Sequence, residues 1–172
     1  MVVVQIVLLF IQLGFVVLLF YLCLAFVTGA PFVPSTDPTA VAMIKFARIK
    51  KGVKVYDLGS GNGKLLFLAA QQVATAVGLE INPLLVIWSR LRAFLSPYRG
   101  MVSTRWQYFW RANLSDSDVV FVYLLPWRME KLEKKLKQEL KPGAVIVSNS
   151  FIFPHWKILR QDPKHHVYVF RA

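Results

Sequence analysis

The feature that most constrains this chain is an uncharged apolar run at its N-terminus. Val2 to Val27 contains no Asp, Glu, Lys or Arg, and its less apolar interruptions are Gln5, Gln12, Tyr21 and Cys23. A helix needs about 20 apolar residues to cross the hydrocarbon core of a bilayer. A secretory signal has a basic segment before a shorter apolar run, but nothing basic precedes this one, and the residues after it make a poor cleavage site. We therefore expect residues 1–28 to form a retained transmembrane anchor.

The positive charge of the chain lies beyond this anchor. The formal net charge is +12, and the first basic residues are Lys45, Arg48, Lys50 and Lys51. Basic residues beside a membrane helix stay on the cytoplasmic side, or on the matrix side in mitochondria. Such a charge also suits a nucleic-acid partner, but topology and attraction to anionic lipid explain it more simply. We expect a single-pass membrane protein whose catalytic domain faces the cytoplasm or the mitochondrial matrix.

The remaining part of the chain is long enough for one domain. The only cysteine of the whole chain, Cys23, lies in the anchor, which excludes an internal disulfide and a cysteine-based metal site; no other metal site is expected. Pro31, Pro34 and Pro38 indicate an extended linker. Asp37 is the expected N-cap of a short lead-in helix that ends near Arg48. This gives an anchor at 1–28, a Pro-rich linker with its lead-in helix at 29–50, and a domain at 51–172.

Strand and helix signals alternate along this domain. Apolar, β-rich runs predict strands, and apolar residues three or four apart predict helices. The expected strands are 53–56, 75–79, 101–108, 118–124, 144–147 and 166–170, and the expected helices are 64–72, 83–95 and 127–140. This alternation predicts an α/β fold with a mostly parallel, doubly wound sheet, covered by helices on both faces.

Glycines follow the first of these strands, where ligands bind in such sheets. The run Asp57-Leu58-Gly59-Ser60-Gly61-Asn62-Gly63 has the spacing GxGxG rather than the GxGxxG of many dinucleotide-binding proteins. A carboxylate at Asp57 disfavours a pyrophosphate but suits the positive amino group and sulfonium of S-adenosylmethionine. Glu80 ends the second strand and is placed to accept hydrogen bonds from both ribose hydroxyls. These features favour S-adenosylmethionine over NAD as the cofactor.

Longer motifs carry a family resemblance across nearly the whole chain. They are APFVPST (30–36), VYDLGSGNGK (55–64), GLEINPLLV (78–86), SRLRAF (89–94), LSDSDVVFVYLLP (114–126), LEKKLKQELKPGA (132–144) and FPHW (153–156). Together they resemble the membrane-anchored, seven-strand class I methyltransferases, whose mitochondrial members methylate lysines of the adenine nucleotide translocase and of the ATP synthase c subunit. The resemblance implies a protein-lysine N-methyltransferase with a Rossmann-like fold.

The resemblance also implies roles for individual residues in cofactor binding. Asp57 and the glycines would hold the methionine part of the cofactor, and Glu80 the ribose. The family often has an acid at the position of Asn62 and an arginine at that of Lys64. The acid that faces the adenine in this family is missing here, and we expect Gln107 to make the adenine contact in its place. The expected cofactor-binding residues are Asp57, Gly59, Gly61, Asn62, Gly63, Glu80, Ile81, Asn82, Gln107 and Tyr108.

The residues that receive the acceptor are predicted from their place after the strands. Methyl transfer is a direct displacement, so an enzyme has mainly to align the acceptor and to desolvate it. Tyr123 and Pro126 follow the fourth strand, where an aromatic face can hold a cation, and ordinary strand packing explains Tyr123 equally well. His155 is a candidate base, although a lone histidine is more often structural. The expected catalytic residues are Tyr123, Pro126 and His155, and the expected substrate residues are Phe32, Pro34, Thr36, Phe153 and Trp156.

Three other functions remain open at this level. A small lipid or quinone-like acceptor explains the anchor equally well. An RNA acceptor suits the charge, but Tyr123-Leu124-Leu125-Pro126 replaces the N/D-P-P-Y/F motif of base amino-group methylation. A non-catalytic scaffold on the membrane would not require Asp57, the three glycines and Glu80 together. The sequence predicts a membrane-protein substrate and leaves the oligomeric state open.

Overall fold

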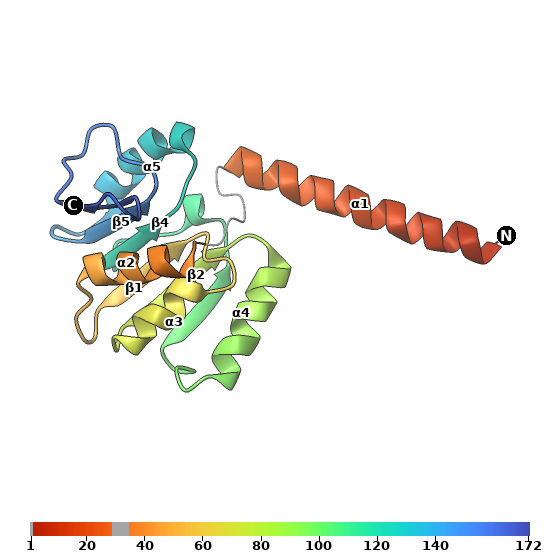
Figure 1. Cartoon of the computed structure of the whole chain (residues 1–172), viewed down its shortest axis with the longest axis horizontal. Helices are drawn as coiled ribbons and strands as arrows, with labels where there is room; N and C mark the ends of the chain where they lie inside the picture. Colours follow the sequence, from red (N-terminus) through yellow and green to blue (C-terminus); the bar gives the residue numbers. More distant parts are fainter. Residues whose placement is uncertain (1, 29–34) are drawn as a thin grey trace.

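In the computed structural model, seven strands form one sheet with helices on both faces (Figure 1). The structure describes residues 2–28 and 35–172, and in the first helix the side chains up to Phe20 and that of Cys23. The elements in chain order are α1 (Val2–Thr28), α2 (Asp37–Ala47), β1 (Lys54–Leu58), α3 (Lys64–Gln71), β2 (Thr75–Glu80), α4 (Pro83–Leu95), β3 (Val102–Trp106), the 3₁₀ turn η1 (Phe109–Arg111), β4 (Val119–Val122), α5 (Pro126–Glu139), β5 (Val145–Asn149), β6 (Arg160–Asp162) and β7 (Val167–Arg171).

The strands lie in the order β3-β2-β1-β4-β5-β7-β6. The first five are parallel, whereas β7 is antiparallel to both β5 and β6. The predicted doubly wound, mostly parallel sheet is therefore confirmed. The sequence analysis missed β6, because its three residues are polar and lack the apolar alternation that predicts a strand.

Alternate residues of each central strand face opposite layers. In β1, Val55 packs on the side of α2 and α3, whereas Tyr56 and Leu58 pack with α5. The sheet is thus buried on both faces, which explains why its strands are continuous apolar runs. The carboxyl ends of β1 to β5 lie at one edge of the sheet, because these strands are parallel.

The lead-in helix α2 belongs to the packed domain. Ala40 and Met43 have no exposed surface, and α2 lies against β5, β7 and α3. Its N-cap is Thr36, one residue before the predicted Asp37: the Thr36 hydroxyl oxygen accepts a hydrogen bond from the Thr39 N–H at 3.4 Å. A hydroxyl caps in the same way as a carboxylate, so sequence alone does not separate the two candidates.

Helix α1 has the properties of a membrane-crossing segment. Its stretch Val2–Phe20 has a mean hydropathy of 2.9, and none of that stretch is buried against the rest of the chain. Figure 1 shows α1 extending away from the sheet and its helices. A signal sequence near the N-terminus can pass the same test of length and hydropathy, so the structure gives an N-terminal apolar helix long enough to span a bilayer.

Gly78 of β2 allows the loop after β1 to pack directly on the sheet. A Cβ atom at this position would lie 2.4 Å from the Ser60 hydroxyl oxygen and 2.7 Å from Cδ1 of Leu66, both of which are buried. We expect Gly78→Ala to lower the free energy of unfolding by about 1–3 kcal/mol, as overpacking usually does. Chemical denaturation of the detergent-solubilised chain measures this.

Gly100→Ala is the matched control, because nothing lies within 4 Å of the position its Cβ would take. We expect it to change stability by less than about 0.5 kcal/mol. Equal stability of the two variants would contradict the close packing of Ser60 on Gly78.

Candidate active site

The loop from Gly59 to Gly63 joins the end of β1 to the start of α3. All three glycines have positive φ angles, at 84°, 54° and 81° in chain order, in the region that other residues rarely adopt. Gly63 also meets a close neighbour, because a Cβ there would lie 2.6 Å from the Ser89 hydroxyl oxygen. The N–H groups of Gly59 and Ser60 both donate to the Leu79 carbonyl oxygen. The GxGxG spacing is thus required by backbone conformation and by packing against β2 and α4.

The carboxylate of Glu80 holds this loop to the end of β2. Glu80 is 7% exposed. Its Oε2 accepts a hydrogen bond from the Gly61 N–H at 2.8 Å, and its Oε1 accepts from the N–H groups of Ile81 at 2.9 Å and Asn82 at 2.8 Å. A carboxylate has about four acceptor positions, so about one is left for a ligand hydroxyl in this arrangement. Glu80 therefore fixes the shape of the glycine loop and also lines the cavity described below.

Asp57 lies one residue before the end of β1 and is buried. Its carboxylate accepts no hydrogen bond from any residue that the structure describes. Burial, together with the nearby negative charge of Glu80, raises the pKa of Asp57 from its ordinary value of 3.8 to about 7. A buried carboxylate without a donor is stabilised by a positive group placed beside it. The α-amino group of S-adenosylmethionine is such a group, so these residues fit the methionine part of that cofactor.

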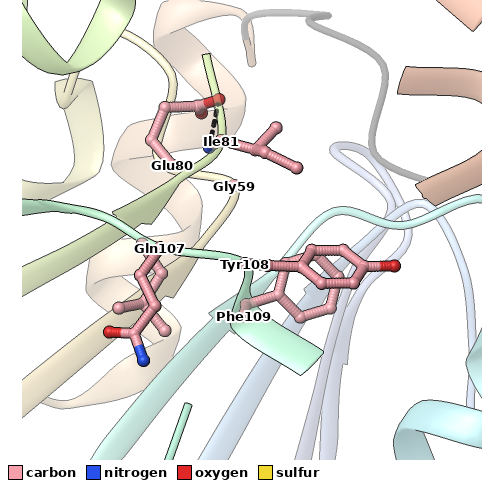
Figure 2. Close-up of a pocket in the computed structure, with 7 residues that line it drawn as sticks. Gly59, Glu80, Ile81, Gln107, Tyr108 and Phe109 are labelled. Atoms are coloured by element: carbon pink, nitrogen blue, oxygen red, sulfur yellow. Dashed lines mark hydrogen bonds between the residues drawn. The ribbon is translucent and has the colours of Figure 1, made fainter. Parts of the chain in front are cut away.

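A cavity opens beside Glu80, at the carboxyl ends of β1, β2 and β3 (Figure 2). It is lined by Gly59, Leu79, Glu80, Ile81, Gln107, Tyr108 and Phe109. Open parallel sheets bind ligands at this edge. The structure thus brings together five of the residues predicted to bind the cofactor: Gly59, Glu80, Ile81, Gln107 and Tyr108. Figure 2 shows the Gln107 amide pointing away from the Glu80 carboxylate, while the Gln107 N–H donates to the Glu80 carbonyl oxygen at 3.0 Å.

The two asparagines among the predicted cofactor residues make local hydrogen bonds. The Asn82 side chain accepts from the Leu84 N–H at 3.0 Å and caps α4. The Asn62 side-chain oxygen accepts from the Lys64 N–H at 3.2 Å, and the Asn62 backbone carbonyl oxygen accepts from the Arg92 guanidinium of α4 at 2.9 Å. Both residues therefore fix the shape of the backbone around the cavity.

Tyr123 follows β4 at the same edge of the sheet. Val122 is in register with Leu58 of β1 and Ser148 of β5, so Tyr123 lies level with Gly59 and Asn149. Pro126 opens α5 three residues later. These two predicted acceptor residues therefore lie at the carboxyl edge, near the glycine loop.

Asn149 is a site residue that the sequence analysis did not single out. It is buried at the end of β5, and its side-chain N–H donates to the Ser35 hydroxyl oxygen at 3.2 Å. The Ser35 carbonyl oxygen in turn accepts from the Lys64 ammonium at 2.8 Å. The chain entering α2, including Thr36, thus passes over this edge; Phe32 and Pro34 lie outside the described residues. A polar residue that ends an apolar strand was the available signal for Asn149.

The Phe153–Trp156 segment lies away from the carboxyl edge of the sheet. Phe153 is buried with its ring centroid 4.9 Å from that of Phe170, which pairs with Ile146 near the start of β5. The His155 backbone N–H donates to Glu133 of α5 at 3.0 Å, and its ring is mostly exposed. The structure therefore does not bring Phe153, His155 or Trp156 to the edge where Tyr123 lies, because the chain after β5 folds back over the α5 face of the sheet.

Comparison with known proteins matches residues 57–160 to the ANTKMT methyltransferase domain. The chain is 36% identical to the ATP synthase c-subunit lysine N-methyltransferase of Homo sapiens over 83% of this chain and 64% of that protein. It is 31% identical to the protein-lysine N-methyltransferase of Saccharolobus islandicus over 86% of this chain and 96% of that protein. The chain spans 51% to 64% of the length of the vertebrate ATP synthase c-subunit lysine N-methyltransferases it matches.

A solved structure is similar to most of this chain. The RNA methyltransferase of Salinibacter ruber, in complex with S-adenosylhomocysteine, superposes with a TM-score of 0.77 at 34% identity, over 81% of this chain and 93% of that one. The sheet order and the acid–glycine site therefore define a class I methyltransferase domain that uses S-adenosylmethionine. Within that class, the chain belongs to the family of the ANTKMT methyltransferase domain.

The raised pKa of Asp57 predicts a pH-dependent affinity for the cofactor product S-adenosylhomocysteine, which keeps the amino group. Only the ionised carboxylate attracts that cation. With a pKa of about 7, we expect the apparent affinity at pH 6 to be about tenfold weaker than at pH 8. Calorimetric titration across this range measures the affinity, and it should also detect release of a proton on binding near pH 7.

Asp57→Asn is the control. Ionisation of Asp57 opposes folding because its pKa in the folded chain lies above the ordinary value; the stability present below about pH 4 is lost as the pH rises through about 7. The variant should therefore unfold at higher temperature than wild type at pH 8, yet bind S-adenosylhomocysteine weakly at every pH. Wild-type affinity in the variant would contradict the assignment.

Proposed function

We propose that this chain is a membrane-bound, S-adenosylmethionine-dependent protein-lysine N-methyltransferase whose substrate is a membrane protein. The proposal rests on the membership of the chain in the ANTKMT methyltransferase domain family. It is supported by the presence of all the acid and glycine residues expected to hold the cofactor, which are Asp57, Gly59, Gly61, Gly63 and Glu80. The Saccharolobus relative, which the chain covers almost end to end, is named a protein-lysine N-methyltransferase. The human relative is named for a lysine of the ATP synthase c subunit.

The residues at the carboxyl edge have separable tasks in this reaction. The cofactor supplies a methyl group on a positively charged sulfur. Asp57 holds the α-amino group, and Glu80 keeps the glycine loop closed while accepting from a ribose hydroxyl. Gly59 and Gly61 leave room at the backbone for the ligand. The remaining task is to present an uncharged amine in line with the methyl group.

The end of β4 suits an amine acceptor. A lysine must lose its proton before it attacks, and removal from water favours the neutral form. Tyr123 is half-buried, and Pro126, which is exposed at the start of α5, donates no backbone N–H. Their apolar surfaces lower the polarity at this point, and the Tyr123 ring offers a face to a cation. Asn149 and Ser35 close the neighbouring side of the edge.

Membrane anchoring explains the choice of acceptor. Helix α1 is long and apolar enough to span a bilayer, and an anchor confines the enzyme to the surface that carries its substrate, which raises their effective concentration. In this proposal the basic domain faces the cytoplasm or the mitochondrial matrix, according to the positive-inside rule.

RNA is the second candidate acceptor. The Salinibacter structure, at 34% identity, is that of an RNA methyltransferase, and a net charge of +12 attracts a polyanion. The anchor and the sequence after β4 favour protein over RNA. The methyl-transfer assay described next also distinguishes a lipid or quinone-like acceptor, and a non-catalytic scaffold, from the protein and RNA acceptors.

We expect tritiated methyl groups from S-adenosylmethionine to enter a discrete protein band when the full chain is incubated with membranes and total RNA of its source organism. The label should be sensitive to protease and resistant to ribonuclease, and acid hydrolysis should release it as methyl-lysine. Glu80→Ala, which removes the carboxylate but not the anchor, should give none. Label in RNA or in the lipid extract would instead establish one of the other acceptors.

A paired substitution tests where the acceptor is handled. We expect Tyr123→Ala to slow methyl transfer by about tenfold or more while leaving S-adenosylhomocysteine affinity unchanged, because it removes the wall of the acceptor site. His155→Ala should change the rate by less than about twofold, because its ring lies beside α5. A loss of about 100-fold for His155→Ala would identify His155 as the base and contradict this arrangement.

A further inference from the structure

Helix α4 exposes an unusually large apolar surface. Its residues Val86, Ser89 and Ala93 are buried against the sheet. On its outer side Leu84 is 71% exposed, Ile87 62% and Leu95 74%. The whole exposed row is Leu84, Ile87, Trp88, Leu91, Phe94 and Leu95. At about 100° per residue these six side chains form one stripe, which is too large and too continuous for an ordinary soluble surface.

The stripe is bordered by positive charge alone. Around the helix axis, Arg90 lies next to one border of the stripe and Arg92 lies next to the opposite border. Residues 83–115 contain five arginines, at 90, 92, 99, 105 and 111, and no Asp or Glu. Arg99 stacks on the Phe94 ring, 4.2 Å from its centroid, at the end of the stripe. An apolar stripe with an arginine border and exposed tryptophan is the composition of a helix that lies in a membrane interface.

We propose that this face of α4, with Trp106, lies in the headgroup region of an anionic bilayer. The charges select this occupant. A second copy of the chain would bring two arginine borders together without an acid between them, and a nucleic acid would leave the six apolar side chains against phosphates or water. An anionic bilayer satisfies both parts, because headgroups pair with the arginines and acyl chains receive the stripe.

The position of α4 in the chain makes this contact compatible with an anchor. Only eight residues, 29–36, separate α1 from α2. Such a segment spans at most about 28 Å even when fully extended, so a domain tethered by α1 stays close to the bilayer. The inference rests on the proposed membrane location of the chain, and it adds a second contact that fixes the orientation of the domain.

The proposed surface adjoins the cofactor cavity. Helix α4 begins directly after Ile81 and Asn82, and Trp106, which is 67% exposed, donates its indole N–H to the Ile81 carbonyl oxygen at 2.9 Å. Ile81 lines the cavity. Docking through α4 would therefore hold the carboxyl edge of the sheet at the level of the membrane surface, within reach of acceptor residues that emerge from the bilayer.

The test places one fluorophore on the stripe of the full chain. In a Cys23→Ser background, a single cysteine at Ile87→Cys carries an environment-sensitive nitrobenzoxadiazole label; Gln138→Cys, on the exposed side of α5, is the matched control. Each protein is reconstituted into phosphatidylcholine vesicles with or without phosphatidylserine, and lipid-borne nitroxide quenches labels that touch the bilayer. We expect quenching at Ile87 to be several-fold greater than at Gln138, and to weaken without phosphatidylserine, at high salt and after Arg99→Gln with Arg105→Gln.

Three results would overturn the proposal. If the chain floats with the vesicles but both labels are equally quenched, α1 anchors the chain and α4 does not dock. If the Ile87 label is shielded from water yet unaffected by the nitroxide, and cross-linking captures a dimer, a second copy covers the stripe. If the chain does not float with vesicles at all, both the docking surface and the membrane location fail. None of these readouts depends on methyl transfer, so a failure of the proposed activity would be seen separately.

Discussion

Three backbone N–H groups converge on the carboxylate of Glu80, and the shape of the candidate cofactor pocket depends on them. One comes from Gly61 in the loop after β1, and two come from Ile81 and Asn82 at the entrance to α4. A single buried acid therefore fixes the loop, the cavity and the start of the helix relative to one another. Its removal would leave buried donors without acceptors, which costs more than the hydrogen bonds themselves contribute.

The same small region combines an electrostatic cost with a binding role. Asp57 lies buried next to Glu80 with no hydrogen-bond donor among the described residues, and its desolvation and the repulsion between the two acids oppose folding. A cationic ligand relieves both. The surface beyond them has the opposite sign, because the 83–115 segment contains arginines but no acid. An acidic pocket bordered by a basic, apolar surface suits an enzyme that holds a cationic cofactor while resting on an anionic membrane.

Much of the fold was predictable because its signals are local. Apolar runs and glycine positions placed most helices and parallel strands within a few residues, and the acid–glycine pattern predicted the loop that Glu80 holds to the end of β2. What failed depended on tertiary contacts. The polar strand β6 forms only by pairing with β7, and α2 looked like a linker helix until packed on the sheet. The direction of the Phe153–Trp156 segment after β5 was likewise not encoded locally.

Hydrogen–deuterium exchange of the full chain with and without S-adenosylhomocysteine tests most directly whether one pocket at the carboxyl edge of β1, β2 and β3 binds the cofactor. We predict slower exchange in peptides covering 57–63, 80–82 and 107–109, with little change in the 153–156 segment, and no effect of NAD at the same concentration. Unchanged exchange in all three peptides at saturating ligand, or protection confined to another part of the domain, would contradict the assignment of this site.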